Sequence, residues 1–371
     1  MSCESQPVRH LYVHIPFCAR ICPYCAFYKT PPDARLAEQF CRALLRELDG
    51  LTSEHHLAPE TIYFGGGTPT ALSLGELELL MAGIRQRLDL TQLREWSIEA
   101  NAGSISAAKA SLLRAGGITR VSLGVQSWNQ RLLHLLGRDH DPARALRAFE
   151  ILRATEFRSL SIDLMFGLPN EDLCEWQRDL EQTIALAPDH ISTYCLTYEE
   201  ETEFFLRQAR GEFRVDEATE AAFFTTAMEL LGRAGFEHYE TSNYAQPGHR
   251  SRHNQAYWRG ADYVGIGPSA VSTVGLARWQ NVADYRAYTA QVLANQPPQR
   301  EVEQLSAATK RSERIALSIR TREGVAADLV DTNADARDEF ERLGLWRRRG
   351  ERFVLTPEGK LLADSIAEAF V

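Results

Sequence analysis

The sequence lacks several features that would place a protein in a special structural class. It has no apolar run near the length of a membrane-spanning helix. Its first residues lack a basic start followed by an apolar stretch and a small-residue cleavage site, so we expect no signal peptide. It also lacks low-complexity tracts and solenoid repeats. With 371 residues, 44% of them hydrophobic and 25% charged, it predicts a globular protein with one barrel-sized domain and smaller ones.

An excess of positive charge is also absent. Lys and Arg number 41 against 50 Asp and Glu, a formal charge of −9, which gives no general case for nucleic-acid binding. One basic run, Arg347–Arg349, falls in a predicted hairpin before a closing helix, an arrangement that resembles a winged helix. A short basic turn is commonly a solvated hairpin tip, so we expect no nucleic-acid partner. Peripheral membrane association and homodimerisation stay open.

Cysteine is scarce and unevenly spaced. Seven cysteines, an odd number, fit a reducing cytoplasm better than a disulfide framework, so we expect a cytoplasmic protein. The scattered ones are expected to be ordinary small side chains. They are Cys3, Cys41, Cys174 and Cys195.

The other three cysteines, Cys18, Cys22 and Cys25, have the spacing C-x-x-x-C-x-x-C. A [4Fe–4S] cluster usually takes one thiolate per iron, so three closely spaced cysteines leave one iron open to a bound molecule. The alternatives are a zinc knuckle or a disulfide pair. Zinc sites favour C-x-x-C pairs completed by a second pair or by histidines, and this sequence has no second cysteine pair. The spacing therefore predicts an iron–sulfur cluster.

This cysteine motif, with the aromatic Tyr24 before its third cysteine, resembles that of the radical S-adenosylmethionine (SAM) superfamily. The resemblance implies that the amino and carboxyl groups of SAM chelate the free iron.

Between residue 10 and about residue 200, β-branched or aromatic runs alternate with amphipathic runs, a pattern typical of repeated βα units. It predicts an α/β fold with an open, partial (β/α)6 barrel. The expected strands are His10–Ile15, Thr61–Gly65, Trp96–Ala100, Arg120–Val125, Ser159–Met165 and His190–Leu196. The expected helices include Asp33–Leu48, Leu74–Arg87, Asp141–Ala154 and Glu171–Ala187.

Informative residues fall at the carboxyl ends of these strands, where such barrels place functional groups. Gly65–Thr68 follow the second strand, while Glu99, Gln126 and Asp163 belong to the third, fourth and fifth. We expect the glycines to let the backbone approach a ligand closely. Each polar side chain could instead satisfy backbone groups or form a solvent-facing ion pair. Their shared location favours one common site.

The order of these elements resembles oxygen-independent coproporphyrinogen III oxidase and its relatives over nearly the whole chain. The matching words are Gly-Gly-Gly-Thr-Pro, Ser-Ile-Glu-Ala-Asn, Leu-Gly-Val-Gln-Ser, Leu-Gly-Arg and Ile-Asp-Leu. Carboxylates can accept hydrogen bonds from the SAM ribose or ammonium group, and Arg and Gln can donate to its carboxylate. The resemblance implies SAM contacts at Tyr12, Tyr24, Gly66, Gly67, Thr68, Glu99, Gln126, Arg138 and Asp163.

Two features separate the oxidase from a heme chaperone within that family. The oxidase motif continues with a cysteine two residues after the third, where this chain has Phe27. The word His253–Trp258 resembles the H-N-x-x-Y-W motif of the heme chaperone branch. This resemblance implies heme coordination by His253, an axial ligand type that heme iron accepts. The Pro247-Gly248 pair predicts a loop rather than a helix here. The alternative role of His253 is therefore that of a loop histidine whose side chain caps backbone groups.

We therefore expect a heme chaperone that binds heme and delivers it to acceptor hemoproteins, without coproporphyrinogen III oxidase activity. The alternative function is that oxidase. Tyr257 and Trp258 would cover the porphyrin. Arg250, Arg252 or Arg259 would lie near its propionates. The expected domains are a radical SAM partial barrel at 1–210, a heme-binding α+β extension at 211–300 and a winged-helix-like end at 301–371.

Overall fold

A computed structural model describes residues 6–214 and 216–371, so Cys3 lies outside the described residues. Contacts divide the chain into two compact units, each made of three segments. Unit 1 comprises Met1–Leu164, Leu196–Arg214 and Asp262–Glu303, and unit 2 comprises Met165–Cys195, Val215–Ala261 and Gln304–Val371. The three-domain division expected from the sequence stays a prediction.

The main sheet of unit 1 has the strand order β5-β4-β3-β2-β1-β9. Each neighbouring pair is parallel, which confirms the predicted βα alternation for the first five strands. The alternation forms the expected α/β fold of a partial barrel. The strands are β1 (Val8–Ile15), β2 (Leu57–Gly66), β3 (Glu95–Asn101), β4 (Arg120–Gln126), β5 (Ser159–Phe166) and β9 (Val264–Ile266).

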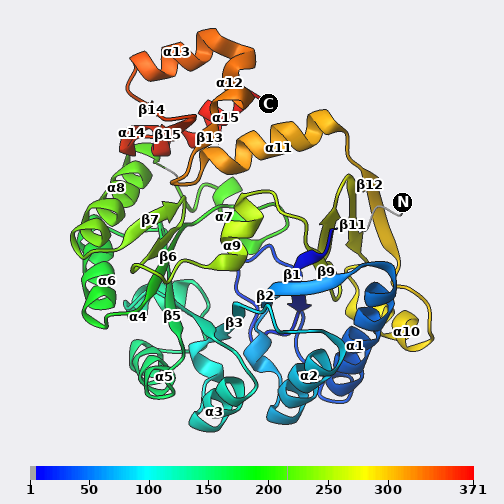
Figure 1. The fold of residues 1–371 in the computed structure, drawn as a ribbon. Helices are drawn as coiled ribbons and strands as arrows, with labels where there is room; N and C mark the ends of the chain where they lie inside the picture. Colours follow the sequence, from blue (N-terminus) through cyan, green and yellow to red (C-terminus); the bar gives the residue numbers. More distant parts are fainter. Residues whose placement is uncertain (1–5, 215) are drawn as a thin grey trace. The chain divides into compact units, whose positions relative to one another are not determined.

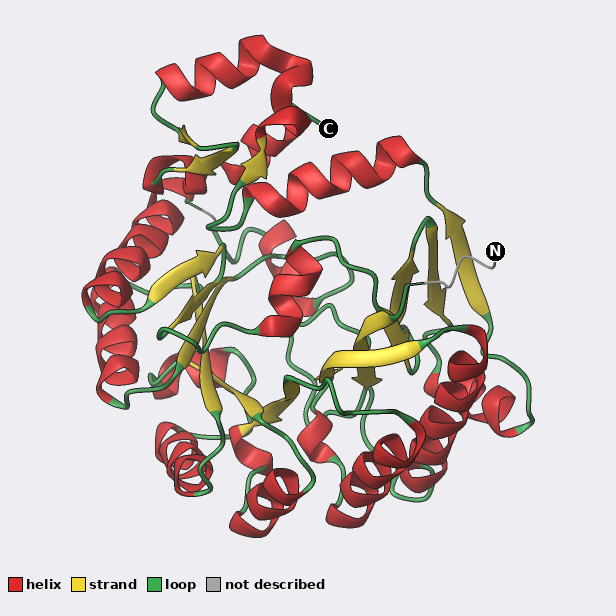
Figure 2. Cartoon of the chain, viewed as in Figure 1, coloured by secondary structure: helices red, strands yellow, loops and turns green. Residues whose placement is uncertain are grey.

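Helices line one side of this sheet, and the predicted helix positions are confirmed with small shifts at their ends. Figure 1 shows α1, α2, α3 and α5 side by side there, and Figure 2 shows these helices outside the strands. Local caps set their starts: Ser73 and Glu76 form a reciprocal capping box at α2. With these four included, the helices of unit 1 are α1 (Ala37–Glu54), α2 (Leu74–Arg87), α3 (Ala107–Ala115), α4 (Gln130–Leu135), α5 (Pro142–Ala154), α7 (Glu203–Ala209) and α10 (Tyr285–Leu293).

Strand β9 was not predicted, because three residues flanked by glycine give no period-two signal. A buried carboxylate ties its segment to the N-terminal helix. Glu47 of α1 accepts hydrogen bonds from Gly267 N at 2.8 Å, from Asn281 Nδ2 at 2.7 Å and from the Tyr288 hydroxyl. Burial raises the pKa of Glu47, and these donors oppose the rise. The same segment adds a small sheet of β10 (Val271–Val274), β11 (Ala277–Asn281) and β12 (Arg300–Gln304).

Unit 2 contains two separate sets of strands. In the first, β8 pairs antiparallel with both β6 and β7; β6 confirms the last of the six predicted strands. Trp176 of α6 donates its indole N–H to the Phe223 carbonyl of α8 at 2.9 Å, which joins the two long helices of this unit. The elements are β6 (His190–Cys195), β7 (Glu237–Glu240), β8 (Asn243–Ala245), α6 (Leu173–Ala185) and α8 (Glu217–Arg233).

The C-terminal segment of unit 2 forms the predicted hairpin, β14–β15, with β13 paired to β15. Its core packs around the buried Trp346, which contacts Phe353 and Phe370. The winged-helix resemblance stays a prediction. The elements are α11 (Ala307–Ile319), β13 (Val325–Ala326), α12 (Ala327–Val330), α13 (Ala334–Arg342), β14 (Trp346–Arg349), β15 (Arg352–Leu355), α14 (Pro357–Leu361) and α15 (Ala363–Glu368).

One prediction is wrong: the segment expected to be a loop contains a helix, α9 (Arg252–Trp258). The Pro-Gly turn ends before it, with Gly248 at φ +88°. The Ser251 hydroxyl then caps the helix by accepting the Asn254 N–H at 3.3 Å. No helix in the described ranges is long and apolar enough to cross a membrane.

Candidate functional site

The cysteine loop follows β1 and is held by backbone hydrogen bonds. Cys18 N donates to the Thr30 carbonyl at 3.0 Å, and Thr30 N donates to the Pro16 carbonyl at 2.8 Å. A turn at the other end places Cys25 N 3.3 Å from the Cys22 carbonyl. These bonds fold the loop back on itself. Its three cysteines all lie within unit 1.

The three cysteines are partly buried, and the charge of Cys22 acts on both Cys18 and Cys25. Burial raises the pKa of Cys18, and negative charge on Cys25 and Cys22 would raise it further. Burial also raises the pKa of Cys25, against the opposing charge of Lys29. Within the described residues, no three His, Cys, Asp or Glu side chains are grouped closely enough to hold a single metal ion.

The glycine word meets the cysteine loop through its backbone. Gly67 N donates to the Ile15 carbonyl at 2.9 Å, and Thr68 N donates to the Phe17 carbonyl at 2.8 Å. The Thr68 hydroxyl lies 3.5 Å from Cys18 Sγ. A side-chain carbon on Gly67 would lie 2.6 Å from the Pro16 carbonyl carbon, closer than atoms pack. This glycine therefore lets two segments of the protein meet, a role beyond the ligand approach expected from the sequence.

Gly66 has φ +110°, and an added Cβ would lie 2.6 Å from the His14 ring. His14 was not among the predicted site residues. Its ring lies within hydrogen-bonding distance of the Tyr28 carbonyl and the Tyr12 hydroxyl, each at 3.1 Å. Burial lowers the pKa of His14 to about 4, which keeps the ring neutral at physiological pH. The available signal was its place two residues from Tyr12, since alternate strand residues share a face.

Glu99, one of the predicted acidic residues, is partly buried and held by two hydrogen bonds. It accepts hydrogen bonds from the Tyr63 hydroxyl at 2.8 Å and from Gly66 N at 3.2 Å. Burial and the nearby Asp163 carboxylate raise its pKa to about 7. Tyr63, which the sequence reasoning missed, thus fixes Glu99, while Tyr12 stacks on Tyr63 with ring centroids 6.2 Å apart.

Asp163 is held by the two serines that flank it in the sheet. Ser122 of β4 donates to its carboxylate at 2.8 Å, and Ser161 of β5 donates at 3.1 Å. The electrostatic influence of Asp163 on Glu99 places both predicted carboxylates in one region of unit 1. Two acceptor groups near the cysteine loop suit a ligand that carries hydroxyl and ammonium donors.

Gln126 and Arg138 supply donors to the same region. Gln126 lies next to an irregularity in the β4–β5 pairing and has φ +72°, a conformation that non-glycine residues rarely adopt and that clusters at functional sites. The Arg138 guanidinium donates to the Gly124 carbonyl at 3.0 Å and lies 3.5 Å from Cys22 Sγ. Arg138 Nε is buried and has no hydrogen-bond partner among the described residues, as expected for a donor that awaits a ligand.

Tyr24 lies in the same region as Arg138. Its ring lies 6.1 Å from that of Phe204 in α7, and Phe204 N donates to the Pro23 carbonyl at 3.1 Å. Burial raises the pKa of Tyr24, and Arg138 opposes this rise. An added Cβ on Gly137 would lie 2.9 Å from Pro23, so the Leu-Gly-Arg word packs directly on the cysteine loop.

His253 lies in unit 2, on the first turn of α9, and its side chain is half-buried. Tyr257, one turn further on, is 49% exposed, and its ring lies 6.0 Å from that of Trp258. Residues four apart share a helix face, so His253 and Tyr257 present one surface. This pair has the chemistry of a metal ligand beside an aromatic face.

Strand β7 holds both ends of α9. The Tyr239 hydroxyl accepts the Ser251 N–H at 3.2 Å. Burial raises the pKa of Glu240 to about 7, opposed by hydrogen-bonding groups of Asn243, Ser242 and the Trp258 indole. Trp258 therefore faces a buried carboxyl, a different environment from the porphyrin contact expected for it.

Comparison with known proteins identifies the family to which this chain belongs. Residues 12–183 match the radical SAM superfamily. The heme chaperone HemW of Lactococcus lactis is 32% identical over 374 residues, covering 97% of this chain and 96% of the relative. HemW of Mycobacterium tuberculosis is 36% identical over 372 residues, with 97% and 94% covered. HemW of Escherichia coli is 39% identical over 266 residues, with 71% and 70% covered.

A solved structure, coproporphyrinogen III oxidase (HemN) from Escherichia coli, described as a radical SAM enzyme, superposes with a TM-score of 0.84. It covers 99% of this chain and 91% of its own at 23% identity, a likeness that establishes the shared fold. By fold and by sequence, the chain belongs to the radical SAM superfamily and, within it, to the family of the HemW relatives.

Proposed function

We propose that this chain binds heme through His253 and delivers it to acceptor hemoproteins. The observation that carries the proposal is the pairing of His253 with an exposed aromatic on α9, in a chain that aligns along almost its whole length with heme chaperones. Imidazole is a common axial ligand of heme iron. The aromatic face of Tyr257 offers apolar area to a porphyrin.

The position of His253 suits a carrier because a carrier must release its cargo. The sequence predicted a loop here, but His253 lies on a capped helix instead. Release then depends on exposure: His253 is half-buried and Tyr257 is half-exposed. A ligand at the protein surface can pass between proteins without the opening of a core.

We also propose that unit 1 holds a [4Fe–4S] cluster and SAM. Cys18, Cys22 and Cys25 would hold the cluster, and the residues around them fit SAM by their donor and acceptor chemistry. The partnerless Nε of Arg138 supports this assignment, as do the two carboxylates near it. When bound, SAM would complete the coordination of the cluster. The proposed SAM contacts are Tyr12, Tyr24, Gly66, Gly67, Thr68, Glu99, Gln126, Arg138 and Asp163.

Heme titration of the His253→Ala protein tests the carrier function. We expect the variant to lose most of its heme affinity, seen as loss of the heme absorption band, with the visible spectrum of the cluster unchanged. His249→Ala is the matched control, because His249 also lies in this segment, half-buried and 4.0 Å from Asp189. Wild-type heme binding and transfer to an apoprotein by His253→Ala would refute the assignment.

The competing function is oxidation of coproporphyrinogen III. Where the oxidase motif carries its further cysteine, this chain has Phe27, whose side chain is 70% exposed. Phenylalanine has no thiol, so any step that needs that cysteine cannot occur here. Reconstituted protein with SAM and a low-potential reductant should release no carbon dioxide from coproporphyrinogen III, and multiple-turnover protoporphyrinogen IX formation would favour the oxidase.

A further inference from the structure

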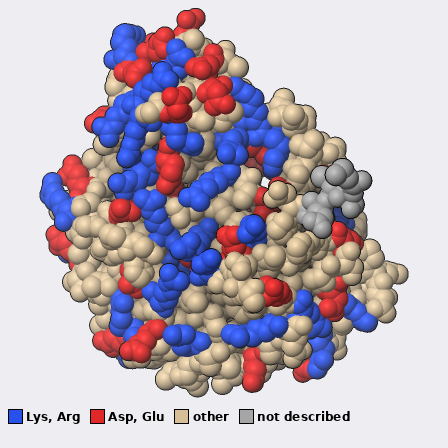
Figure 3. All heavy atoms as spheres, in the orientation of Figure 1, with Lys and Arg blue, Asp and Glu red and all other residues tan. Residues whose placement is uncertain are grey.

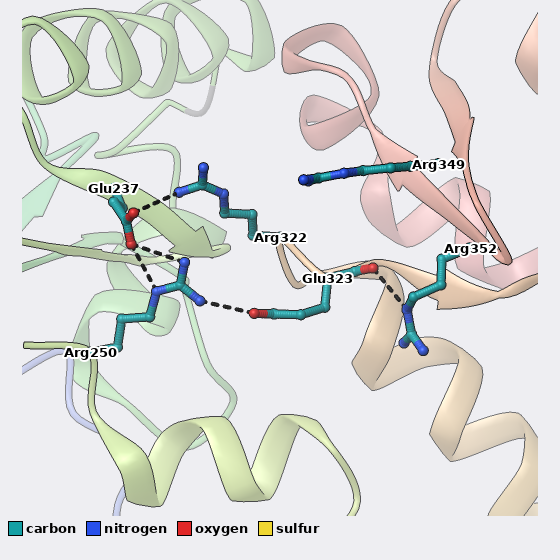
Figure 4. Close-up of a pocket in the computed structure, with 6 residues that line it drawn as sticks. All are labelled: Glu237, Arg250, Arg322, Glu323, Arg349 and Arg352. Carbon is teal, nitrogen blue, oxygen red and sulfur yellow. Dashed lines mark hydrogen bonds and ion pairs between the residues drawn. The ribbon is translucent and has the colours of Figure 1, made fainter. Parts of the chain in front are cut away.

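Unit 2 contains a pocket of about 430 Å³ that the proposed heme and SAM sites do not use. Its residues come from β7, the segment before α9, the turn after α11 and the β14–β15 hairpin, and their side chains converge on one space (Figure 4). We call it the arginine pocket. Its lining residues are Glu237, Arg250, Arg322, Glu323, Arg349 and Arg352.

The charges of the arginine pocket do not balance. Arg250 bridges both carboxylates: its guanidinium is 2.9 Å from Glu237 and 2.9 Å from Glu323. Arg322 shares Glu237 at 3.3 Å. The two carboxylates thus pair with two arginines, and one of them, Arg250, was among the three arginines expected near the heme propionates.

Two hairpin arginines of the pocket, Arg349 and Arg352, form no ion pair with a carboxylate of the described residues. Arg352 donates to the backbone carbonyls of Glu323 and Gly324, which carry no net charge. Among the described residues no carboxylate pairs with Arg349, and Figure 4 shows its side chain extended toward Arg322. The pocket therefore holds an excess of two positive charges.

The fold places these like charges together. Arg349 and Arg352 are direct partners in the antiparallel β14–β15 pairing, so their side chains emerge on the same face. Like charges opposite each other destabilise a sheet. Figure 3 shows Lys and Arg side chains gathered over this part of the surface, with Asp and Glu side chains among them. A bound anion between these guanidinium groups would relieve the repulsion.

We propose that the arginine pocket binds a doubly charged oxyanion, either a phosphate monoester or a pair of carboxylates. Guanidinium groups bind both chemistries through paired hydrogen bonds. Arg349 is the donor free to turn toward such a ligand, and Arg322 can add the guanidinium N–H groups that do not face Glu237. Arg250 and Arg352 stay in place through their bonds to Glu237, Glu323 and Gly324. Because the site is partly open to solvent, its affinity falls as ionic strength rises.

Calorimetric titration of the full chain in a low-salt, phosphate-free buffer tests the site. Inorganic phosphate and glutarate are the probes, one for each source of the oxyanion. We expect saturable binding of at least one probe, and about fivefold weaker binding by Arg349→Gln. Arg347→Gln is the matched control, since it removes the same charge from the same exposed strand outside the pocket. We expect it to bind like the wild type.

The two probes separate the sources: stronger phosphate binding identifies a phosphate ester as the ligand class, and stronger glutarate binding identifies a dicarboxylate. Binding of neither probe would overturn the proposal. Equal weakening by Arg349→Gln and Arg347→Gln would overturn it too, because general charge would then explain the effect. Neither probe contains heme, so failure here is distinct from failure of the carrier function.

Discussion

Arg138 and Cys22 are neighbours, with the guanidinium Nη1 3.5 Å from the thiol sulfur although 116 residues separate them in the chain. From the sequence, we expect Arg138 to contact SAM and Cys22 to bind iron. The contact joins both roles in one place. It sets a guanidinium beside one of the three proposed cluster ligands.

Cys22→Ser should abolish a stable cluster, because a serine hydroxyl does not supply the thiolate that iron requires. The measurement is iron and sulfide content together with the visible spectrum after anaerobic reconstitution. Cys174→Ser, at an exposed cysteine of α6, should reconstitute normally. A Cys22→Ser protein with its full iron content would remove this cysteine from the site.

Asp163→Ala should weaken SAM binding roughly a hundredfold while the cluster remains, because a charged hydrogen-bond partner in a partly buried site typically contributes a few kcal/mol. Calorimetry on the reconstituted protein measures the affinity. Asp89→Ala, which removes an exposed carboxylate of unit 1, should leave it unchanged. Equal SAM affinity in wild type and Asp163→Ala would show that Asp163 does not bind SAM, although it accepts hydrogen bonds from Ser122 and Ser161.

Gly67→Ala should destabilise the protein by roughly 1–3 kcal/mol, because overpacking forces the backbone to shift where the new Cβ meets Pro16 at 2.6 Å. Chemical denaturation measures the loss. Gly75→Ala is the control, since Gly75 has nothing within 4 Å of its would-be Cβ and lies in α2. It should gain about 0.5–1 kcal/mol from better helix propensity. A stable Gly67→Ala protein would contradict the packing described here.

Glu171→Gln should raise stability at alkaline pH. Burial raises the pKa of Glu171 to about 8, above the usual range near 4.3 of an unfolded chain. Between these values the folded state holds the extra proton, so wild-type stability falls as pH rises and the full cost is reached above pH 8. Gln carries no such charge and still accepts the Leu168 N–H, which lies 3.0 Å from the native carboxylate.

Thermal unfolding at pH 5 and pH 9 checks this prediction. The gain for Glu171→Gln should be on the order of 3 kcal/mol at pH 9 and much smaller at pH 5. Glu181→Gln, at an exposed position on α6, should show no comparable pH dependence. The same gain at both pH values would mean that the charge of Glu171 is not its cause.

Much of unit 1 could be predicted because its signals are local. Strands β1 to β5 show in short β-branched and aromatic runs, and the helices between them show in apolar residues at helical spacing. The cysteine spacing is also local, since Cys18, Cys22 and Cys25 lie within one loop. Because parallel strands bring their carboxyl ends to one edge, the order of the strands alone predicted that Glu99 and Asp163 would share a region.

Features made by contacts between distant segments could not be predicted. His14 and Tyr63 gain their roles from what the fold places beside them, namely Gly66 and Glu99. Helix α9 was not predicted, because the neighbouring Pro-Gly turn indicated a loop and the N-cap role of Ser251 was not recognised. Position 67 requires glycine because the backbone of Pro16 packs against it. This contact joins residues far apart in the chain, so a local sequence pattern does not show it.

The sequence by itself determined the α/β alternation, the cluster of three cysteines and the family resemblance, because periodicity and spacing are properties of neighbouring residues. The tertiary structure decided the pairing of Arg138 with Cys22 and the convergence of four segments on the arginine pocket. Both depend on packing between residues far apart in the chain, which fixes distances that a linear pattern does not contain.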